Sequence, residues 1–219
     1  MSLSKKAFLF IGIILLVDQA IKILIKTNMY LNEQIPVFGN WFYLSFTENP
    51  GMAFGMHFGG PFGKILLVLF RIVTVAILII YIPKISRKSG ITTGLILGLA
   101  GICAGALGNI IDSSFYGLIF NSGTSFNAEY GEYLGYSGVS QLSLSGYSSF
   151  LHGCVVDMFY FPLIETRYPE WFPLYGGKEF IFFRPVFNFA DASISVSVAY
   201  IFLFQRKAAN ILLKRQATA

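Results

Sequence analysis

Two aspartates in the C-terminal half of the chain combine a residue type and a setting that favour acid–base chemistry. Asp157 follows two valines and precedes an aromatic segment, and Asp191 opens a long apolar run. A carboxylate at a membrane boundary is costly, so it is usually paired or kept for function. Two carboxyl groups that lie close together share a proton, because both cannot ionise easily. One can then activate water while the other protonates the leaving amine or polarises the carbonyl, so we predict hydrolysis without a cofactor.

Other catalytic chemistries have less support in the sequence. The chain contains two histidines, His57 and His152, and no H-E-x-x-H motif, so we predict no metal site. It contains no G-x-S-x-G motif and no glycine-rich loop after a strand. A Ser/Lys dyad built on Lys22 lacks a serine nearby in the sequence at a matching depth. The carboxylate pair therefore remains the favoured chemistry.

The composition indicates where this pair must work. Of 219 residues, 55% are hydrophobic and only 12% are charged, and a soluble domain has about twice that charged fraction. We predict an α-helical integral membrane protein. The net charge of +5 comes from basic residues at the ends of apolar runs, so we predict no nucleic-acid partner.

Four apolar runs predict four transmembrane helices in a single membrane domain that spans residues 1–219. Each run is close to the roughly 20 helical residues that cross a bilayer core. The runs cover residues 7–26, 64–82, 91–112 and 187–205. Lys5 and Lys6 precede the first run without a small-residue cleavage site, so we interpret it as a retained helix.

The charges outside these runs predict the orientation. Basic residues without acidic neighbours gather on one side: Lys5, Lys6, Lys84, Arg87, Lys88, Arg206, Lys207, Lys214 and Arg215. The positive-inside rule then places both termini and the loop 83–90 in the cytoplasm. Residues 27–63 and 113–186 become extracytoplasmic loops. Asp18, Asp112 and Asp191 all fall toward the outer side, which indicates one site there.

The two outer loops differ in composition. Residues 27–63 read as short strands around a turn and predict a small sheet on the membrane, a β-cradle. Residues 121–150 are rich in Ser, Gly and Tyr, and we interpret them as a flexible or weakly ordered insertion. Residues 158–186 are rich in aromatics and proline, which favours an interfacial loop or helix segment over the outer helix ends.

Several polar residues have spacings that could support a site. Asn188 lies three residues before Asp191, so the two share a helix face, and Asn109 has the same relation to Asp112. Asp18 and Lys22 are four residues apart. An intramembrane ion pair that only orients helices and a role in the site both remain open for them.

Five glycines of the third run fall on one helix face, with spacings of four and three: Gly94, Gly98, Gly101, Gly105 and Gly108. Such a stripe lets a second helix backbone approach closely, so we predict helix packing at this face.

Five motifs in order make the chain resemble the lipoprotein signal peptidase family, also called signal peptidase II. The motifs are Val17-Asp18-Gln19 with Lys22; Glu48-Asn49-Pro50-Gly51-Met52-Ala53-Phe54; Gly105-Ala106-Leu107-Gly108-Asn109-Ile110-Ile111-Asp112; Val155-Val156-Asp157; and Phe187-Asn188-Phe189-Ala190-Asp191. The resemblance implies that Asp157 and Asp191 are catalytic. It also implies that other motif residues support the site or contact substrate, namely Asp18, Lys22, Asn49, Gly51, Gly105, Gly108, Asn109, Asp112 and Asn188.

The resemblance further implies an aspartic endopeptidase of the bacterial inner membrane with no cofactor. Its substrate would be a prolipoprotein, cleaved just before a diacylglyceryl-modified cysteine. The site would face the extracytoplasmic side, with membrane lipid as a second partner, and we expect a monomer.

The chain departs from the family pattern in two places. Ser113 stands where the family usually has arginine after the aspartate of the third motif, and Arg184 is our candidate replacement because it precedes the fourth run. The insertion at 121–150 also separates motifs that the family places close together.

A different class, a small proton-coupled transporter that uses intramembrane carboxylates, remains the alternative, although no inverted repeat is visible. A purely structural membrane subunit would leave the placed aspartates unexplained.

Overall fold

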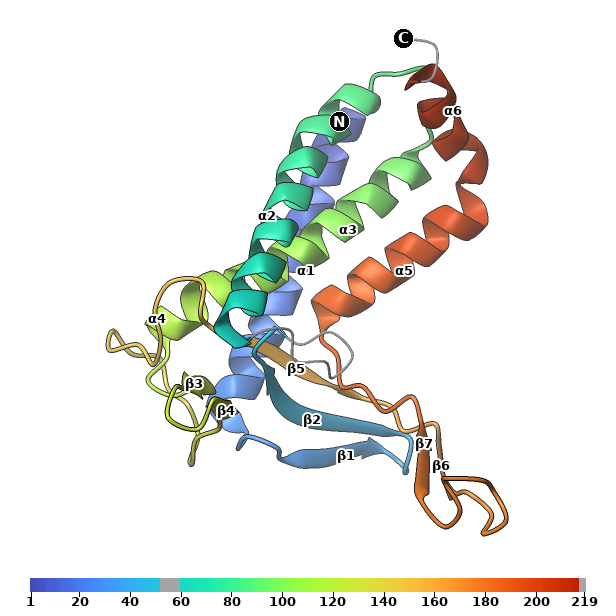
Figure 1. Ribbon diagram of the computed structural model, residues 1–219. Coiled ribbons are helices and arrows are strands. Elements are labelled where there is room, and N and C mark those ends of the chain that lie inside the picture. The colour runs from blue at the N-terminus through green and yellow to red at the C-terminus, as the bar shows by residue number, and fades with distance from the viewer. Residues whose placement is uncertain (52–59, 217–219) are drawn as a thin grey trace.

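The computed structural model describes residues 1–51 and 60–216. Long helices form an elongated bundle with a small sheet at one end, and the N-terminus lies at the other end (Figure 1). The long helices are α1 (Leu3–Asn28), α2 (Gly60–Ile85), α3 (Thr93–Ile111) and α5 (Phe189–Phe204). A helix that was not predicted, α6 (Arg206–Gln216), follows α5 near the C-terminus.

Local signals explain where these helices begin. Ser2 and Thr92 cap α1 and α3, and the Thr92 hydroxyl accepts a hydrogen bond from the backbone N–H of Leu95 at 3.1 Å. Asn188 caps α5 in the same way, accepting from the N–H of Asp191 at 2.8 Å. Such side chains satisfy backbone donors that the first helical turn leaves free. The cap at α5 therefore also fixes the position of a candidate catalytic residue.

The third helix lies at the centre of the bundle and packs against α1, α2 and α5. Its glycine stripe faces α5, as the spacing predicted. A Cβ atom added at Gly98 would lie 2.7 Å from Cγ1 of Ile201, and one added at Gly105 would lie 2.6 Å from Cγ1 of Ile194. These separations are too short for any side chain, so glycine permits the close approach of the two helices.

Three antiparallel strands form the main sheet in the order β1 (Gln34–Phe38), β2 (Phe42–Asn49) and β5 (Val155–Tyr160). The first two strands confirm the predicted strands of the first loop. The third strand comes from the second loop and places Asp157 opposite Thr47, with Glu48 opposite Val156. Nearly all of β5 is buried, because the strand that carries Asp157 pairs with β2 and packs against α1.

The region 113–186 is more structured than we predicted. α3 continues through a π-helix, η1 (Asp112–Tyr116), into the short α4 (Gly117–Ile119), and two hairpins follow. They are β3 (Ser125–Asn127) with β4 (Glu132–Leu134), and β6 (Ile164–Arg167) with β7 (Glu179–Phe182).

The expectation of a weakly ordered insertion is wrong for the residues that pack inward. The Tyr147 hydroxyl accepts a hydrogen bond from the Cys154 N–H at 2.8 Å, and Thr124 and Ser140 are buried. Aromatic packing supplies the physical reason, since Tyr147 lies against the buried cluster that contains Tyr116 and Phe120. Aromatics in a Ser/Gly-rich segment can bury enough area to hold it in place.

Helix length and composition support an integral membrane protein. Within the described residues, three helical segments are long and apolar enough to cross a bilayer: Leu3–Asn28, Pro61–Ile85 and Thr93–Ile119. Large apolar side chains such as Leu16, Phe70 and Phe204 remain about 70% exposed on the bundle surface, as expected for a surface that faces lipid. α5 is apolar but has only 16 residues, so a fourth span is a prediction.

Candidate active site

Asp157 and Asp191 line the same cavity, which has a volume of about 780 Å³. β5 contributes Asp157 and the first turn of α5 contributes Asp191. β2, α2 and the segment 184–187 form the other walls. Asp157 is almost fully buried, whereas Asp191 is half-buried. The fold therefore brings together the two residues that sequence reasoning singled out.

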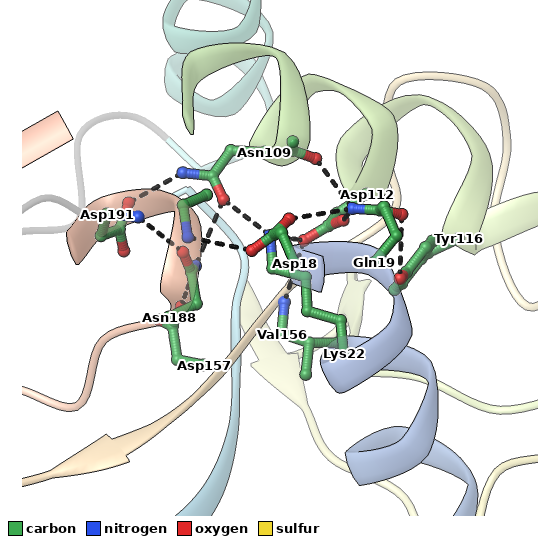
Figure 2. A network of polar contacts seen from close by, with 12 residues as sticks. Asp18, Gln19, Lys22, Asn109, Asp112, Tyr116, Val156, Asp157, Asn188 and Asp191 are labelled. Atoms are coloured by element: carbon green, nitrogen blue, oxygen red, sulfur yellow. Dashed lines mark hydrogen bonds and ion pairs between the residues drawn. The ribbon is translucent and has the colours of Figure 1, made fainter. Parts of the chain in front are cut away.

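Two asparagines hold the aspartates in place. Asn188 donates a hydrogen bond from Nδ2 to Oδ1 of Asp157 at 2.6 Å, and its Oδ1 accepts from the N–H of Asp191. Asn109 donates from Nδ2 to Oδ1 of Asp191 at 2.8 Å. The asparagines also bond to each other, from Asn188 Nδ2 to Asn109 Oδ1 at 3.2 Å (Figure 2). Each carboxylate thus has a fixed orientation.

The environment of Asp157 favours its protonated form. Burial, and after it the negative charge of Asp191, raise the pKa of Asp157 to about 8, against smaller lowering contributions from the hydrogen bond of Asn188, the charge of Lys22 and a hydrogen bond from Asn49. Burial disfavours the charged form because the low dielectric solvates it poorly. Asp157 therefore holds a proton at pH 7, which is the state that a general acid needs.

A buried ionic cluster lies directly behind this pair. Lys22 pairs with Asp112 at 2.7 Å and with Asp18 at 3.0 Å, and donates to Oδ1 of Asn109 at 3.0 Å. All three charged side chains are fully buried. The predicted pair of Asp18 and Lys22 is confirmed, and Asp112 joins it. Because Lys22 also contacts Asn109, the cluster supports the amide that orients Asp191.

Two further contacts connect the cluster to the backbone beside each candidate catalytic residue. Asp18 accepts a hydrogen bond from the N–H of Ala190 at 2.9 Å, and Asp112 accepts from the N–H of Val156 at 3.4 Å. These donors immediately precede Asp191 and Asp157 in the chain. The cluster thus positions the start of α5 and the strand β5 relative to each other.

The glycine positions of the motifs have steric roles. A Cβ atom added at Gly108 would lie 2.6 Å from Oδ2 of Asp18, so only glycine leaves room for that carboxylate. Gly51 has a φ of +104°, which favours glycine, and its N–H donates to Oδ1 of Asn49 at 2.9 Å. The rest of that motif, residues 52–54, lies outside the described residues.

Residues 10–206 match the family model described as signal peptidase (SPase) II. The chain belongs to this family. The lipoprotein signal peptidase of Porphyromonas gingivalis is 44% identical over 210 residues, which cover 95% of this chain and 86% of that protein. The lipoprotein signal peptidase of Amoebophilus asiaticus is 38% identical over 209 residues, covering 93% and 80%.

A solved structure, described as a bacterial membrane enzyme determined by the in meso method at 2.3 Å resolution, has a TM-score of 0.58 and 18% identity. The matched region covers 94% of this chain and 91% of the chain in the solved structure. This likeness supports the fold. The resemblance expected from the five motifs is confirmed by the family match, and membership in signal peptidase II disfavours the transporter alternative.

The cavity wall contains an arginine that sequence reasoning missed. Arg71 of α2 lines the cavity, and so does Arg184, the residue proposed from its proximity to α5. Arg184 therefore lies at the cavity wall, and its role in the site stays a prediction. Arg71 gave no signal because it lies far from both aspartates in the sequence, within a run that was read only as a span.

Two other polar contributors were also missed. Gln19 donates to Asp112 at 2.9 Å and to Asp18 at 3.1 Å, and its position within the first motif was the available signal. Lys26 forms a second buried ion pair with Glu48 of β2. Lys26 lies four residues after Lys22, on the same face of α1, and this spacing could have revealed it.

The described residues, 1–51 and 60–216, contain no group of three His, Cys, Asp or Glu side chains that could hold a metal ion. His57 lies outside those ranges. Within them, His152 bonds through Nδ1 to the Ser149 hydroxyl and the Phe150 carbonyl, which is an ordinary turn environment. Metal independence stays a prediction.

Proposed function

We propose that this protein is a membrane aspartic endopeptidase that removes signal peptides from prolipoproteins, with Asp157 and Asp191 as the catalytic pair. The observation that carries the proposal is one cavity with both carboxyl groups on its wall, each oriented by an asparagine amide. Membership in the signal peptidase II family and the names of the relatives agree with this activity.

The two environments assign different roles to the two residues. Asp191 is half-buried in the cavity wall, so it can reach a water molecule and remove its proton as general base. Asp157, with its raised pKa, donates its proton to the carbonyl oxygen of the scissile bond. The tetrahedral intermediate then collapses, Asp157 recovers its proton, and Asp191 passes the proton from water to the leaving amine.

The cavity wall suits a substrate with both peptide and lipid parts. β2 presents Asn49 and Thr47 on one side, and Leu67 and Ile194 contribute apolar surface from α2 and α5. A peptide could therefore lie along the sheet while acyl chains extend toward the bilayer between the helices. This arrangement supports cleavage just before a diacylglyceryl-modified cysteine.

The proposed location is the bacterial inner membrane, with four spans, both termini in the cytoplasm and the site on the extracytoplasmic side. The basic residues at the helix ends support it, as does the position of the N-terminus and of α6 at the end opposite the sheet (Figure 1). Membrane lipid would be a partner, and we expect a monomer. A reporter fused near residue 130 should read extracytoplasmic, and a cytoplasmic signal there would contradict this topology.

Cleavage by the purified protein tests the proposed function. In detergent with added phospholipid, a diacylglyceryl-modified prolipoprotein should lose its signal peptide, whereas the same precursor without the lipid should remain intact. Cleavage should survive EDTA, because the proposed chemistry uses no metal. A wild-type protein that folds, yet leaves the lipid-modified precursor uncut, would refute the proposal.

A further inference from the structure

Arg71 occupies an unusual position for a charged residue. α2 is strongly apolar, and a charge within a transmembrane helix is costly unless it serves a pairing or functional role. Arg71 and Leu67 are one helical turn apart and both line the cavity, whereas Phe70, the residue before Arg71, is 68% exposed on the outer surface. The helix therefore turns this arginine toward the catalytic pair and away from the lipid.

The side chains around the cavity carry more negative than positive charge, and the guanidinium of Arg71 offsets part of this excess. Lys22 already pairs with two carboxylates, Asp18 and Asp112, so that cluster has an excess negative charge. The catalytic pair with one shared proton adds another negative charge. Buried charge of one sign is unfavourable without compensation.

The remaining ionic groups near the cavity are mostly occupied. Glu48 of β2 pairs with Lys26, and Lys64 of α2 donates to the His152 carbonyl at 2.7 Å. Arg184 is exposed at the rim. Among the described residues, Arg71 is thus the cation that a helix contributes to the cavity wall shared with Asp157 and Asp191.

In the part of the chain that the structure describes, Arg71 makes no direct ion pair with either aspartate. Among the described residues, the ion pairs within 4.0 Å involve Lys22 and Lys26, so Arg71 acts on the two aspartates across the cavity. At such a distance a cation changes the charge balance of a carboxyl pair without holding either oxygen in a direct bond.

We propose that Arg71 is a positioning residue for catalysis that balances the negative charge of the Asp157–Asp191 pair and so sets the pH range in which the pair works. The role rests on the proposed function of that pair. It also gives the cavity a basic group from α2, although Ser113 stands where the family usually has arginine. Arg71 is not itself assigned a proton-transfer step.

The sign of the effect follows from electrostatics. A nearby cation favours the ionised form of a carboxyl group, and an opposite charge lowers its pKa by about 1–3 units. Replacing Arg71 by a neutral residue should therefore move the basic limb of the pH profile of kcat/KM, which reports the proton on Asp157, to higher pH by about one unit. Arg71→Lys keeps the charge and should keep the profile in place.

Three variants make the test specific. Arg71→Gln removes the cation, Arg71→Lys retains it, and Lys84→Gln removes an exposed cation from the last turn of the same helix. The measurement is kcat/KM for lipid-modified prolipoprotein from pH 5 to pH 10. The expected result is an upward shift for Arg71→Gln alone. Equal profiles for all three variants and the wild type would overturn the proposal.

A second measurement does not depend on cleavage. Infrared difference spectroscopy detects the carbonyl band of a protonated carboxyl group, and Asp157→Asn identifies the band from that residue. The band should persist to higher pH in folded Arg71→Gln than in the wild type, and Arg71→Met provides a second neutral variant if the first does not fold. An unchanged titration would overturn the role of Arg71, whereas an absence of wild-type cleavage would refute the proposed function instead.

Discussion

Asp157 lies in a setting that serves chemistry at a cost in stability. An aspartate in an unfolded chain has a pKa of about 3.9, and burial in the fold raises the pKa of Asp157 to about 8. Between these values the folded state binds one proton more than the unfolded state. The free energy of unfolding therefore decreases as pH rises through this window.

Asp157→Asn should remove this penalty, because its amide oxygen can still accept the hydrogen bond from Asn188. We expect the variant and the wild type to have similar thermal unfolding midpoints in detergent near pH 4. At pH 8 the variant should unfold at a temperature several degrees higher. A difference that stays constant between pH 4 and pH 8 would show that Asp157 titrates as an ordinary aspartate.

Two exposed arginines, one at the rim of the cavity and one away from it, provide a matched comparison. Arg184 lines the cavity, whereas Arg167 lies in the β6–β7 hairpin. Arg184→Ala should lower kcat/KM several-fold, because a cation beside the bound substrate is lost, and Arg167→Ala should have little effect. Steady-state kinetics with the lipid-modified precursor measure both, and equal values would remove Arg184 from the site.

At the scale of elements, the contact between α3 and α5 determines where Asp191 lies. A side chain at Gly105 would collide with the Ala190 carbonyl and with Ile194, so Gly105→Ala should displace the first turn of α5 and the bond from Asn109 to Asp191. Overpacking of this kind costs about 1–3 kcal/mol. We expect activity to decrease at least about tenfold for this displacement.

Gly12→Ala is the control for that variant. Gly12 lies in α1, and an added Cβ there would have no atom within 4 Å. Activity of Gly12→Ala should match the wild type, and its unfolding midpoint should be no lower, because alanine favours the helix more than glycine does. If Gly105→Ala also matched it, the close contact between α3 and α5 would have no role in positioning the site.

The insertion is fixed to the sheet by the buried pair of Lys26 and Glu48. The Lys26 ammonium also donates to the Ser122 carbonyl at 3.0 Å and lies 5.0 Å from the centre of the Phe120 ring. The Thr124 N–H donates to the Glu48 carboxylate. Glu48 precedes Asn49 and pairs with Val156, so this contact supports the strands beside Asp157.

Glu48→Gln should leave the Lys26 cation buried without its counterion. Removing one partner of a buried pair costs about 3–5 kcal/mol, which a lower unfolding midpoint in detergent would report. Glu132→Gln, at an exposed position of β4 in the same insertion, should have no measurable effect. Equal midpoints for both variants would show that the pair contributes nothing to the docking of the insertion.

At the scale of the whole molecule, sequence patterns predicted the elements better than the contacts between distant segments. The long apolar runs predicted α1, α2 and α3, because length and composition are local properties. The joining of β5 to β2 depends on segments more than 100 residues apart in the chain, and no local pattern encodes that register. Residue type and setting singled out Asp157 and Asp191, whereas the supporting residues were proposed because five motifs resembled a family.

The residues that were missed share a physical reason. Arg71 and Lys26 lie in helices whose apolar composition dominated their interpretation, and their partners lie in other elements. Periodicity places a side chain on a helix face but does not say what faces it. The packing of the 121–150 insertion was missed for the same reason, since its aromatics bury against helix and sheet residues that only the fold brings near.

The central claim is that Asp157 and Asp191 act together as the catalytic pair. The most direct measurement is the single-turnover rate of cleavage of lipid-modified prolipoprotein by folded Asp157→Asn and Asp191→Asn at pH 7. Losing general acid–base action costs about 100- to 10,000-fold, and both variants should fall within or beyond that range while their thermal unfolding stays cooperative. A rate above about one tenth of the wild-type rate in either folded variant, well outside that range, would contradict the account.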